Sequence, residues 1–149
     1  MTSTSAAAPT RNRALTVAGG LVAAIVVAVA LNAVVALIAP AAGASDDFQP
    51  LTFPAYATFT VLGILAGAAG WVLIRSRARR PRALLRRLVP IVLVVSFVPD
   101  LLVGADGSAP GVSWGAVAAL MVMHLVVAAV AVTVYARLWP VSDTADRAH

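Results

Sequence analysis

The chain has 149 residues, 61% of them hydrophobic and 11% charged, with a formal net charge of +5 and a mean hydropathy of +0.94. Soluble domains average about 45–50% apolar and about 25% charged residues, so a chain of this size has too little polar surface for a water-facing fold. The composition excludes an ordinary soluble domain and predicts a membrane protein. The absence of cysteine excludes disulfides, thiolate metal sites and cysteine nucleophiles.

A helix needs about 20 apolar residues to cross a hydrocarbon core about 30 Å thick, and four stretches of the chain meet or approach that length. Open strands would leave backbone groups unpaired in lipid, and these stretches lack the alternation of barrel strands. The predicted fold is therefore an all-α membrane protein, a bundle of four transmembrane helices over residues 14–139. The expected spans are 14–39, 55–74, 88–105 and 114–138, with a disordered cytoplasmic tail at 1–13 and a second cytoplasmic tail at 140–149.

The arginines predict the orientation of these spans. All eleven cations are Arg, and an even number of crossings puts every one on the same side, whereas Asp46, Asp47 and Asp106 lie in the opposite loops. Because cytoplasmic loops carry the excess of basic residues, both termini are predicted to be cytoplasmic. Aromatic residues expected to form interfacial belts lie at the inner ends (Trp71, Trp139) and the outer ends (Phe53, Tyr56, Trp114) of the spans.

The first stretch follows Arg11 and Arg13 and ends before "PAAGA" (40–44), a pattern also typical of a secretory signal with a small-residue cleavage site. Signal cores have only 7–15 apolar residues, and this stretch is longer, so we expect it to be retained as a span. It carries Asn32, about 10 Å below the outer boundary at the helical rise of about 1.5 Å per residue.

The second stretch contains "GILAGAAG" (63–70), which places Gly63 and Gly67 four residues apart and Gly70 one step round the helix. Small residues at this interval let helix backbones approach closely in lipid, where no hydrophobic force drives association. We expect these glycines to pack within the bundle or, alternatively, to form a homodimer seam. Gly19 and Gly20 on the first stretch are candidate partners for either use.

Between the second and third stretches lies "RSRARRPRALLRR" (75–87), with seven arginines. The segment is held between two spans and has no aromatic residues for base stacking, so we expect no nucleic-acid partner. Its expected role is to stay in the cytoplasm and bind anionic lipid headgroups, at about 1 kcal/mol per Arg. The residues expected to contact anionic lipid are Arg75, Arg77, Arg79, Arg80, Arg82, Arg86 and Arg87.

The third stretch carries an acid within "SFVPDLLVG" (96–104), which places Asp100 about 5–8 Å below the outer boundary. Ser96 lies one turn deeper on the same face, and Pro99 removes a backbone donor, so we expect a kink here. Three interpretations of Asp100 stay open. It anchors a broken helix end, pairs with a polar group of another span such as Asn32 or His124, or binds or relays a proton or ligand.

The fourth stretch carries His124, about 15 Å deep and close to the midplane. We expect a neutral imidazole that is hydrogen-bonded to a neighbouring span. An axial gap of about 7–10 Å to Asp100 argues against a direct bond, although a water would bridge it. Two-histidine haem ligation would need a dimer, because the only other histidine is His149. We expect no cofactor and no metal site, and Asp46 and Asp47 are interpreted as solvated loop acids.

The pairing of "SFVPDLLVG" with "ALMVMHLVVAAVAV" (119–132) resembles an uncharacterised family of small four-span membrane proteins found mainly in actinobacteria. Pro99 and the run Met123–His124–Leu125 carry the resemblance, which covers nearly the whole chain, from about residue 14 to 139. It implies the four-helix fold and a plasma-membrane location, and it implies no particular activity.

Two hypotheses about function follow. HExxH and Walker motifs are absent, so the first is a non-enzymatic, multi-pass component of the bacterial plasma membrane with an accessory, sensory or interaction role. Its expected partners are anionic lipid and either a second copy or another membrane protein. The alternative is a small oligomeric carrier or proton-coupled permeation unit. That alternative requires the intramembrane polar residues Asn32, Ser96, Asp100 and His124 to converge on one cavity open to the outer side.

Overall fold

A computed structural model describes residues 8–142 of the chain, and within that range every regular element is helical. Four helices are long and apolar enough to cross a membrane, which confirms the predicted fold class. Two short 3-10 turns lie between the first two long helices. The elements are α1 (Ala8–Ile38), η1 (Ala39–Ala42), η2 (Gln49–Leu51), α2 (Phe53–Arg77), α3 (Pro81–Asp106) and α4 (Trp114–Leu138).

Three helices begin earlier than the sequence predicted, α2 by two residues and α1 and α3 by more. α1 is helical from Ala8, so residues 8–13 are not a disordered tail, while residues 1–7 and 143–149 lie outside the described range. α3 begins at Pro81 instead of residue 88, so three arginines of the basic segment lie on its first turns. The prediction ended each span where apolar residues ended, but a helix can continue into the headgroup region. Proline favours the first helical position, because its ring fixes the backbone angle φ at a helical value.

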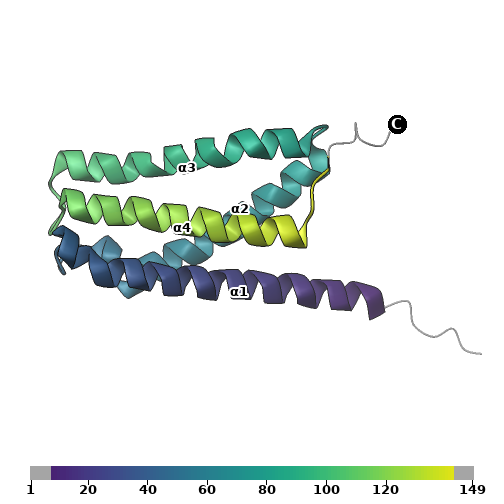
Figure 1. The fold of residues 1–149 in the computed structure, drawn as a ribbon, viewed down its shortest axis with the longest axis horizontal. Coiled ribbons are helices and arrows are strands. Elements are labelled where there is room, and N and C mark those ends of the chain that lie inside the picture. Colours follow the sequence, from purple (N-terminus) through teal and green to yellow (C-terminus); the bar gives the residue numbers. More distant parts are fainter. Residues whose placement is uncertain (1–7, 143–149) are drawn as a thin grey trace, which may run out of the picture.

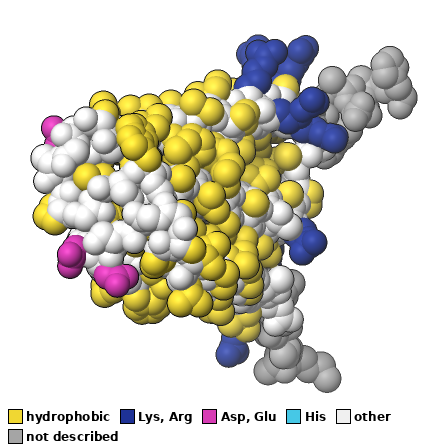
Figure 2. All heavy atoms as spheres, turned by 60° about the vertical axis from the view of Figure 1, so that its left-hand side comes forward, with side chains coloured by type: hydrophobic (Ala, Val, Ile, Leu, Met, Phe, Trp, Pro, Cys, Tyr) yellow, Lys and Arg dark blue, Asp and Glu magenta, His cyan; other side chains and the backbone are white. Residues whose placement is uncertain are grey.

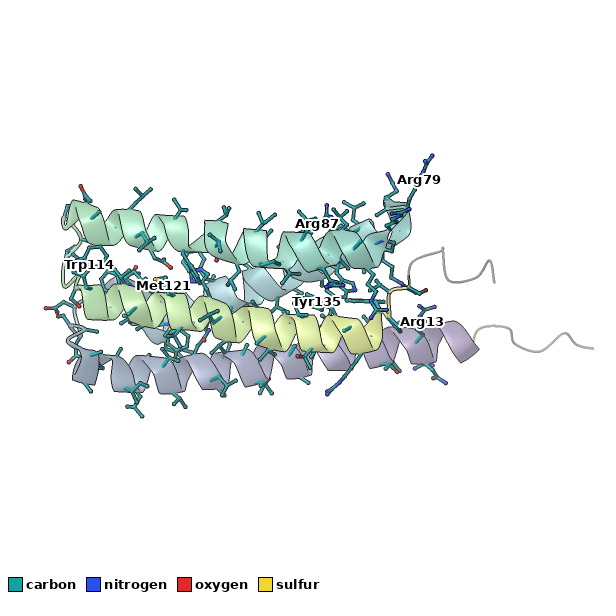
Figure 3. All side chains as sticks on the ribbon, turned by 45° about the horizontal axis from the view of Figure 1, so that its top comes forward. Arg13, Arg79, Arg87, Trp114, Met121 and Tyr135 are labelled. Carbon is teal, nitrogen blue, oxygen red and sulfur yellow. The ribbon has the colours of Figure 1, made fainter. Side chains whose placement is uncertain are left out.

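The two described ends of the chain lie together. The start of α1 and the end of α4 are at one end of the bundle (Figure 1). Arg side chains gather at this end and Asp side chains at the opposite one (Figure 2). Arg13 and Arg79 mark the first and Trp114 the second (Figure 3). We call these the Arg-rich end and the Asp-bearing end. The separation of charge agrees with four crossings in alternating directions.

The buried residues form two apolar clusters stacked along the bundle. The cluster toward the Arg-rich end contains Ala24, Ala28, Ile64, Ala68, Trp71, Leu85, Ala131 and Tyr135. The cluster toward the Asp-bearing end contains Val35, Ala39, Ala44, Phe48, Tyr56, Ala116, Ala119 and Met123. Alanine dominates both, because small side chains allow the close backbone approach on which helix packing in lipid depends. Large apolar side chains remain exposed on all four helices, where acyl chains would cover them.

Aromatic residues close the Arg-rich end of the bundle from inside. The indole Nε1 of Trp71 donates to the carbonyl oxygen of Trp139 at 3.1 Å, and the Tyr135 hydroxyl donates to the carbonyl of Ile64. The Trp71 and Tyr135 rings lie 5.7 Å apart, and both side chains are buried. The prediction that Trp71 and Tyr56 belong to interfacial belts was therefore wrong, since both are core residues. A buried indole or phenol needs a hydrogen-bond partner, and the bundle supplies one for Trp71 and Tyr135.

Phe53 and Trp114, by contrast, are exposed at the Asp-bearing end, as an interfacial belt requires. At the same end α4 passes very close to the η1 turn. A Cβ at Gly115 would overlap the carbonyl oxygen of Ala42, so only glycine fits at that position. The Ser113 hydroxyl caps α4 by accepting from the Ala116 backbone N–H at 3.1 Å.

Candidate functional site

A level of polar side chains separates the two apolar clusters. On α1, Asn32 lies between Ala28 of one cluster and Val35 of the other. On α2, Thr60 lies between Tyr56 and Ile64, and on α4, His124 follows Met123 of the cluster at the Asp-bearing end. α3 contributes Asp100, which contacts His124. All four helices therefore bring one hydrogen-bonding or ionisable group to the same part of the bundle.

Asn32 pairs with Thr60 across the α1–α2 contact. The Asn32 side-chain amide donates to the Thr60 hydroxyl at 2.9 Å, and the two residues are only 1% and 3% exposed. The Asn32 carbonyl oxygen Oδ1 is buried and has no hydrogen-bond partner within the described part of the chain. Sequence analysis singled out Asn32 but missed Thr60. Threonine is common in apolar helices, and only the paired structure identifies this one.

This pair gives a stability prediction. Replacing Thr60 with Val removes the acceptor of the buried Asn32 amide, and we expect a loss of about 1–2 kcal/mol in unfolding free energy. The double replacement Asn32→Leu with Thr60→Val is expected to recover most of that loss, because two apolar groups leave no buried polar atom unpaired. Reversible unfolding in mixed micelles, followed by circular dichroism, measures both values. Equal losses in the single and double variants would contradict this account.

Asp100 and His124 meet across the α3–α4 contact. The carboxylate oxygen Oδ2 of Asp100 lies 3.2 Å from Nδ1 of His124, and the Phe97 ring packs on the imidazole edge to face, with centroids 6.0 Å apart. The predicted axial gap therefore does not keep the two side chains apart, although no hydrogen bond joins them. Cα–Cβ bonds tilt toward the N-terminus of their helix. Because α3 and α4 run in opposite directions, Asp100 leans toward the Arg-rich end and His124 leans the other way, so the side chains converge.

The position of one hydrogen determines the chemistry of this pair. Nδ1 of His124 lies 2.9 Å from the carbonyl oxygen of Leu120, one turn back on α4. Because a carbonyl oxygen can only accept a hydrogen bond, this bond requires that Nδ1 carries the hydrogen and donates it to Leu120. The Asp100 oxygen Oδ2 is close enough for electrostatic attraction but lies outside hydrogen-bond geometry, and it is buried without a hydrogen-bond donor among residues 8–142. The expected bond from His124 to a neighbouring span is thus replaced by a bond within α4 and a close contact with the Asp100 carboxylate of α3.

The remaining predicted member, Ser96, bonds only to its own helix, because its hydroxyl donates to the Leu93 carbonyl at 2.7 Å. Asn32 and Asp100 each pair with a different residue on a different helix. Neither of the two grooves described in the structure is lined by any of the four predicted residues. The structure thus places Asn32 in one helix contact and Asp100 with His124 in another.

α3 runs unbroken through Pro90 and Pro99 to Asp106, and Gly107, with φ of 67°, ends it in the left-handed conformation. Asp100 therefore does not mark the end of a broken helix. The pairing interpretation, with His124 as partner, is the one that the geometry matches.

Two of the three predicted packing glycines on α2 contact another helix, and the third does not. A Cβ at Gly63 would meet Val127 at 3.8 Å, and one at Gly67 would meet the Tyr135 hydroxyl at 3.0 Å, so both glycines face α4. Gly70 has no heavy atom within 4 Å of such a Cβ. The suggested partner glycines on α1 are not used by α2. Gly20 instead packs against Leu138 of α4, and Gly19 has open space.

The seven arginines of the basic segment are all exposed around the Arg-rich end. They extend from the last turn of α2 to the first turns of α3, which spreads their charge round the rim of the bundle (Figure 2). Among residues 8–142, no group of three or more His, Asp or Glu side chains lies close enough to hold a metal ion. His149, weighed as a haem ligand, lies outside that range.

The helices and their contacts define a multi-pass helical membrane protein. Comparison of the sequence with family models places it further: the chain belongs to a family of unknown function (DUF6069), whose model matches residues 5–139. The match includes Pro99 and the run 123–125, so the expected membership in an uncharacterised family covering most of the chain is confirmed. No curated protein and no solved structure matches the chain.

Proposed function

We propose that this protein is a non-enzymatic component of a bacterial plasma membrane, actinobacterial by the sequence resemblance, with both termini in the cytoplasm. It acts there by sensing or by binding other membrane components, and it does not carry a solute. The basic rim at the end where α1 begins and α4 ends supports the orientation, because positive charge is retained on the cytoplasmic side. The rim also supports anionic lipid headgroups as partners and argues against nucleic acid, since it would lie against the membrane surface.

The separation of the polar residues into two helix contacts carries the argument against transport. A carrier needs a site that several helices form together and that opens to one side of the membrane. Here Asn32 and Thr60 join α1 to α2, while Asp100 and His124 join α3 to α4. Paired in this way, the groups serve as polar contacts that fix how the helices pack. These separate pairings do not support the convergence of the four residues that the carrier hypothesis required.

A flux measurement tests this proposal. Purified protein reconstituted in liposomes is expected to pass protons no faster than protein-free liposomes under an imposed pH gradient. The variants His124→Ala and Asp100→Asn are expected to behave like the wild type, because the pair holds two helices together and conducts nothing. A protonophore provides the positive control, and equal protein incorporation is checked on gels. Wild-type flux above background that either variant abolishes would establish a proton relay and overturn the proposal.

A further inference from the structure

A groove of about 380 Å³ lies between α1 and α4, in the half of the bundle nearer the Arg-rich end. Apart from Arg137, the residues of its walls are apolar or small on both helices. Between the groove and the Arg-rich end, Leu138 of α4 packs closely against Gly20 of α1. The lining residues are Ala23, Ala24, Val27, Ala129, Val130, Thr133, Val134 and Arg137.

The α4 wall of this groove has a regular order. Ala129, Thr133 and Arg137 are four residues apart, so they follow one face of the helix from the middle of the bundle toward the Arg-rich end. The distance from Ala129 to Arg137 is about 12 Å at the helical rise, close to the thickness of hydrocarbon in one leaflet. The Thr133 hydroxyl donates to the carbonyl of Ala129 and so presents little polarity to the groove.

Arg137 adds a charge at the end of this apolar channel. Its side chain is exposed in the last turn of α4, and it makes no hydrogen bond or ion pair with any of residues 8–142. A guanidinium at the membrane surface can bind a phosphate through two parallel hydrogen bonds. The groove thus combines an apolar channel as deep as one leaflet with a phosphate-binding group at headgroup level.

We propose that the α1–α4 groove binds one anionic phospholipid from the leaflet at the Arg-rich end, with an acyl chain along Ala23 and Ala129 and the phosphate on Arg137. Charge argues for lipid over a second copy of the chain. In the same membrane a second copy in the same orientation brings its own arginine-bearing end to the level of Arg137. Those like charges would repel one another.

Native mass spectrometry of the detergent-purified protein tests the proposal, with phosphatidylglycerol and phosphatidylcholine of identical acyl chains as probes. The wild type is expected to bind one phosphatidylglycerol more tightly than phosphatidylcholine. Arg137→Gln is expected to weaken phosphatidylglycerol binding about fivefold, the loss expected for one Arg near the surface, and to remove the preference between the two lipids. Ala129→Leu, which fills an exposed position in the groove, is expected to weaken both lipids alike.

Arg77→Gln is the matched control, because Arg77 is exposed at the same end but does not line the groove. If Arg77→Gln and Arg137→Gln weaken phosphatidylglycerol binding equally, the lipid responds to the overall positive charge of this end and not to the groove. That result would overturn the proposed site. A dimer that Ala129→Leu dissociates while lipid binding stays unchanged would assign the groove to a second copy. Thermal unfolding of each variant verifies the fold. Should Ala129→Leu not fold, the comparison of the two arginine variants still decides the proposal.

Discussion

Replacing Gly115 with Ala is expected to destabilise the protein by about 2–3 kcal/mol, the upper range for overpacking a close contact. The added Cβ would occupy the position of the Ala42 carbonyl oxygen, which belongs to backbone and has no rotamer by which to move away. α4 would have to move away from the η1 turn. That movement would loosen the cluster at the Asp-bearing end, to which Ala39 of η1 and Ala116 and Ala119 of α4 belong. Unfolding in mixed micelles measures the loss.

Gly70→Ala is the matched control for this experiment. It adds the same methyl group to a helix of the same bundle, but nothing lies within 4 Å of the new atom. Alanine favours the helix over glycine by up to about 1 kcal/mol, so this variant is expected to be as stable as the wild type or slightly more stable. Equal destabilisation by the two substitutions would mean that α4 does not approach the η1 turn closely.

Removing His124 is expected to cost about 2 kcal/mol, because His124→Ala leaves the Asp100 carboxylate in the apolar interior without its neighbouring cation or dipole. Asp100→Asn is expected to cost about 1 kcal/mol, since a neutral amide is more easily accommodated there. The double variant should cost less than the sum of the two by about 1 kcal/mol, within the range measured for polar contacts between transmembrane helices. A double-mutant cycle on unfolding free energies gives this coupling directly.

Additive losses would show that the two side chains do not interact, and the 3.2 Å contact would then have no energetic meaning. The matched control is Ser96→Ala, which removes a polar group of α3 that bonds only to its own helix. We expect Ser96→Ala to show no coupling with His124→Ala.

The packing of α3 explains why this pair should matter. Only 6% of the residues in its most apolar window are buried, against 17–22% for the other three helices. Its buried residues, Pro81 and Leu85, lie near the Arg-rich end. Toward the Asp-bearing end, α3 is held to α4 by Asp100, by Phe97 on the imidazole ring, and by the close approach of Gly104 to Val117. The Asp100–His124 contact is therefore one of three interactions identified between the outer half of α3 and α4.

A sensing role would use this same property. A helix with few buried residues can change its position when one of its interhelical contacts changes. α3 also begins in the basic segment, so a displacement of its outer half would be connected to the arginines at the Arg-rich end through one continuous helix. The proposed lipid groove lies between α1 and α4 and does not include α3, so lipid binding and α3 movement can be measured separately.

The sequence by itself determined the number of membrane-spanning helices and the common location of the two described ends of the chain. These features follow from the length of apolar runs and the placement of charge, which act residue by residue and need no knowledge of neighbours. It also identified Asn32, Asp100 and His124 as unusual, because a polar group in an apolar span is costly wherever it lies. Helix bounds were less well predicted, since hydropathy records where lipid ends and not where backbone hydrogen bonding ends.

Only the tertiary structure decided which of these groups meet. Depth along a span predicted a gap between Asp100 and His124, but the opposed tilt of side chains on antiparallel helices closes it. Thr60 and Gly115 carried no signal in the sequence, because their importance comes from one atom on another helix or turn. The α1–α4 groove likewise depends on how two helix faces are rotated toward each other. Periodicity places residues on a face, whereas packing alone determines what that face contacts.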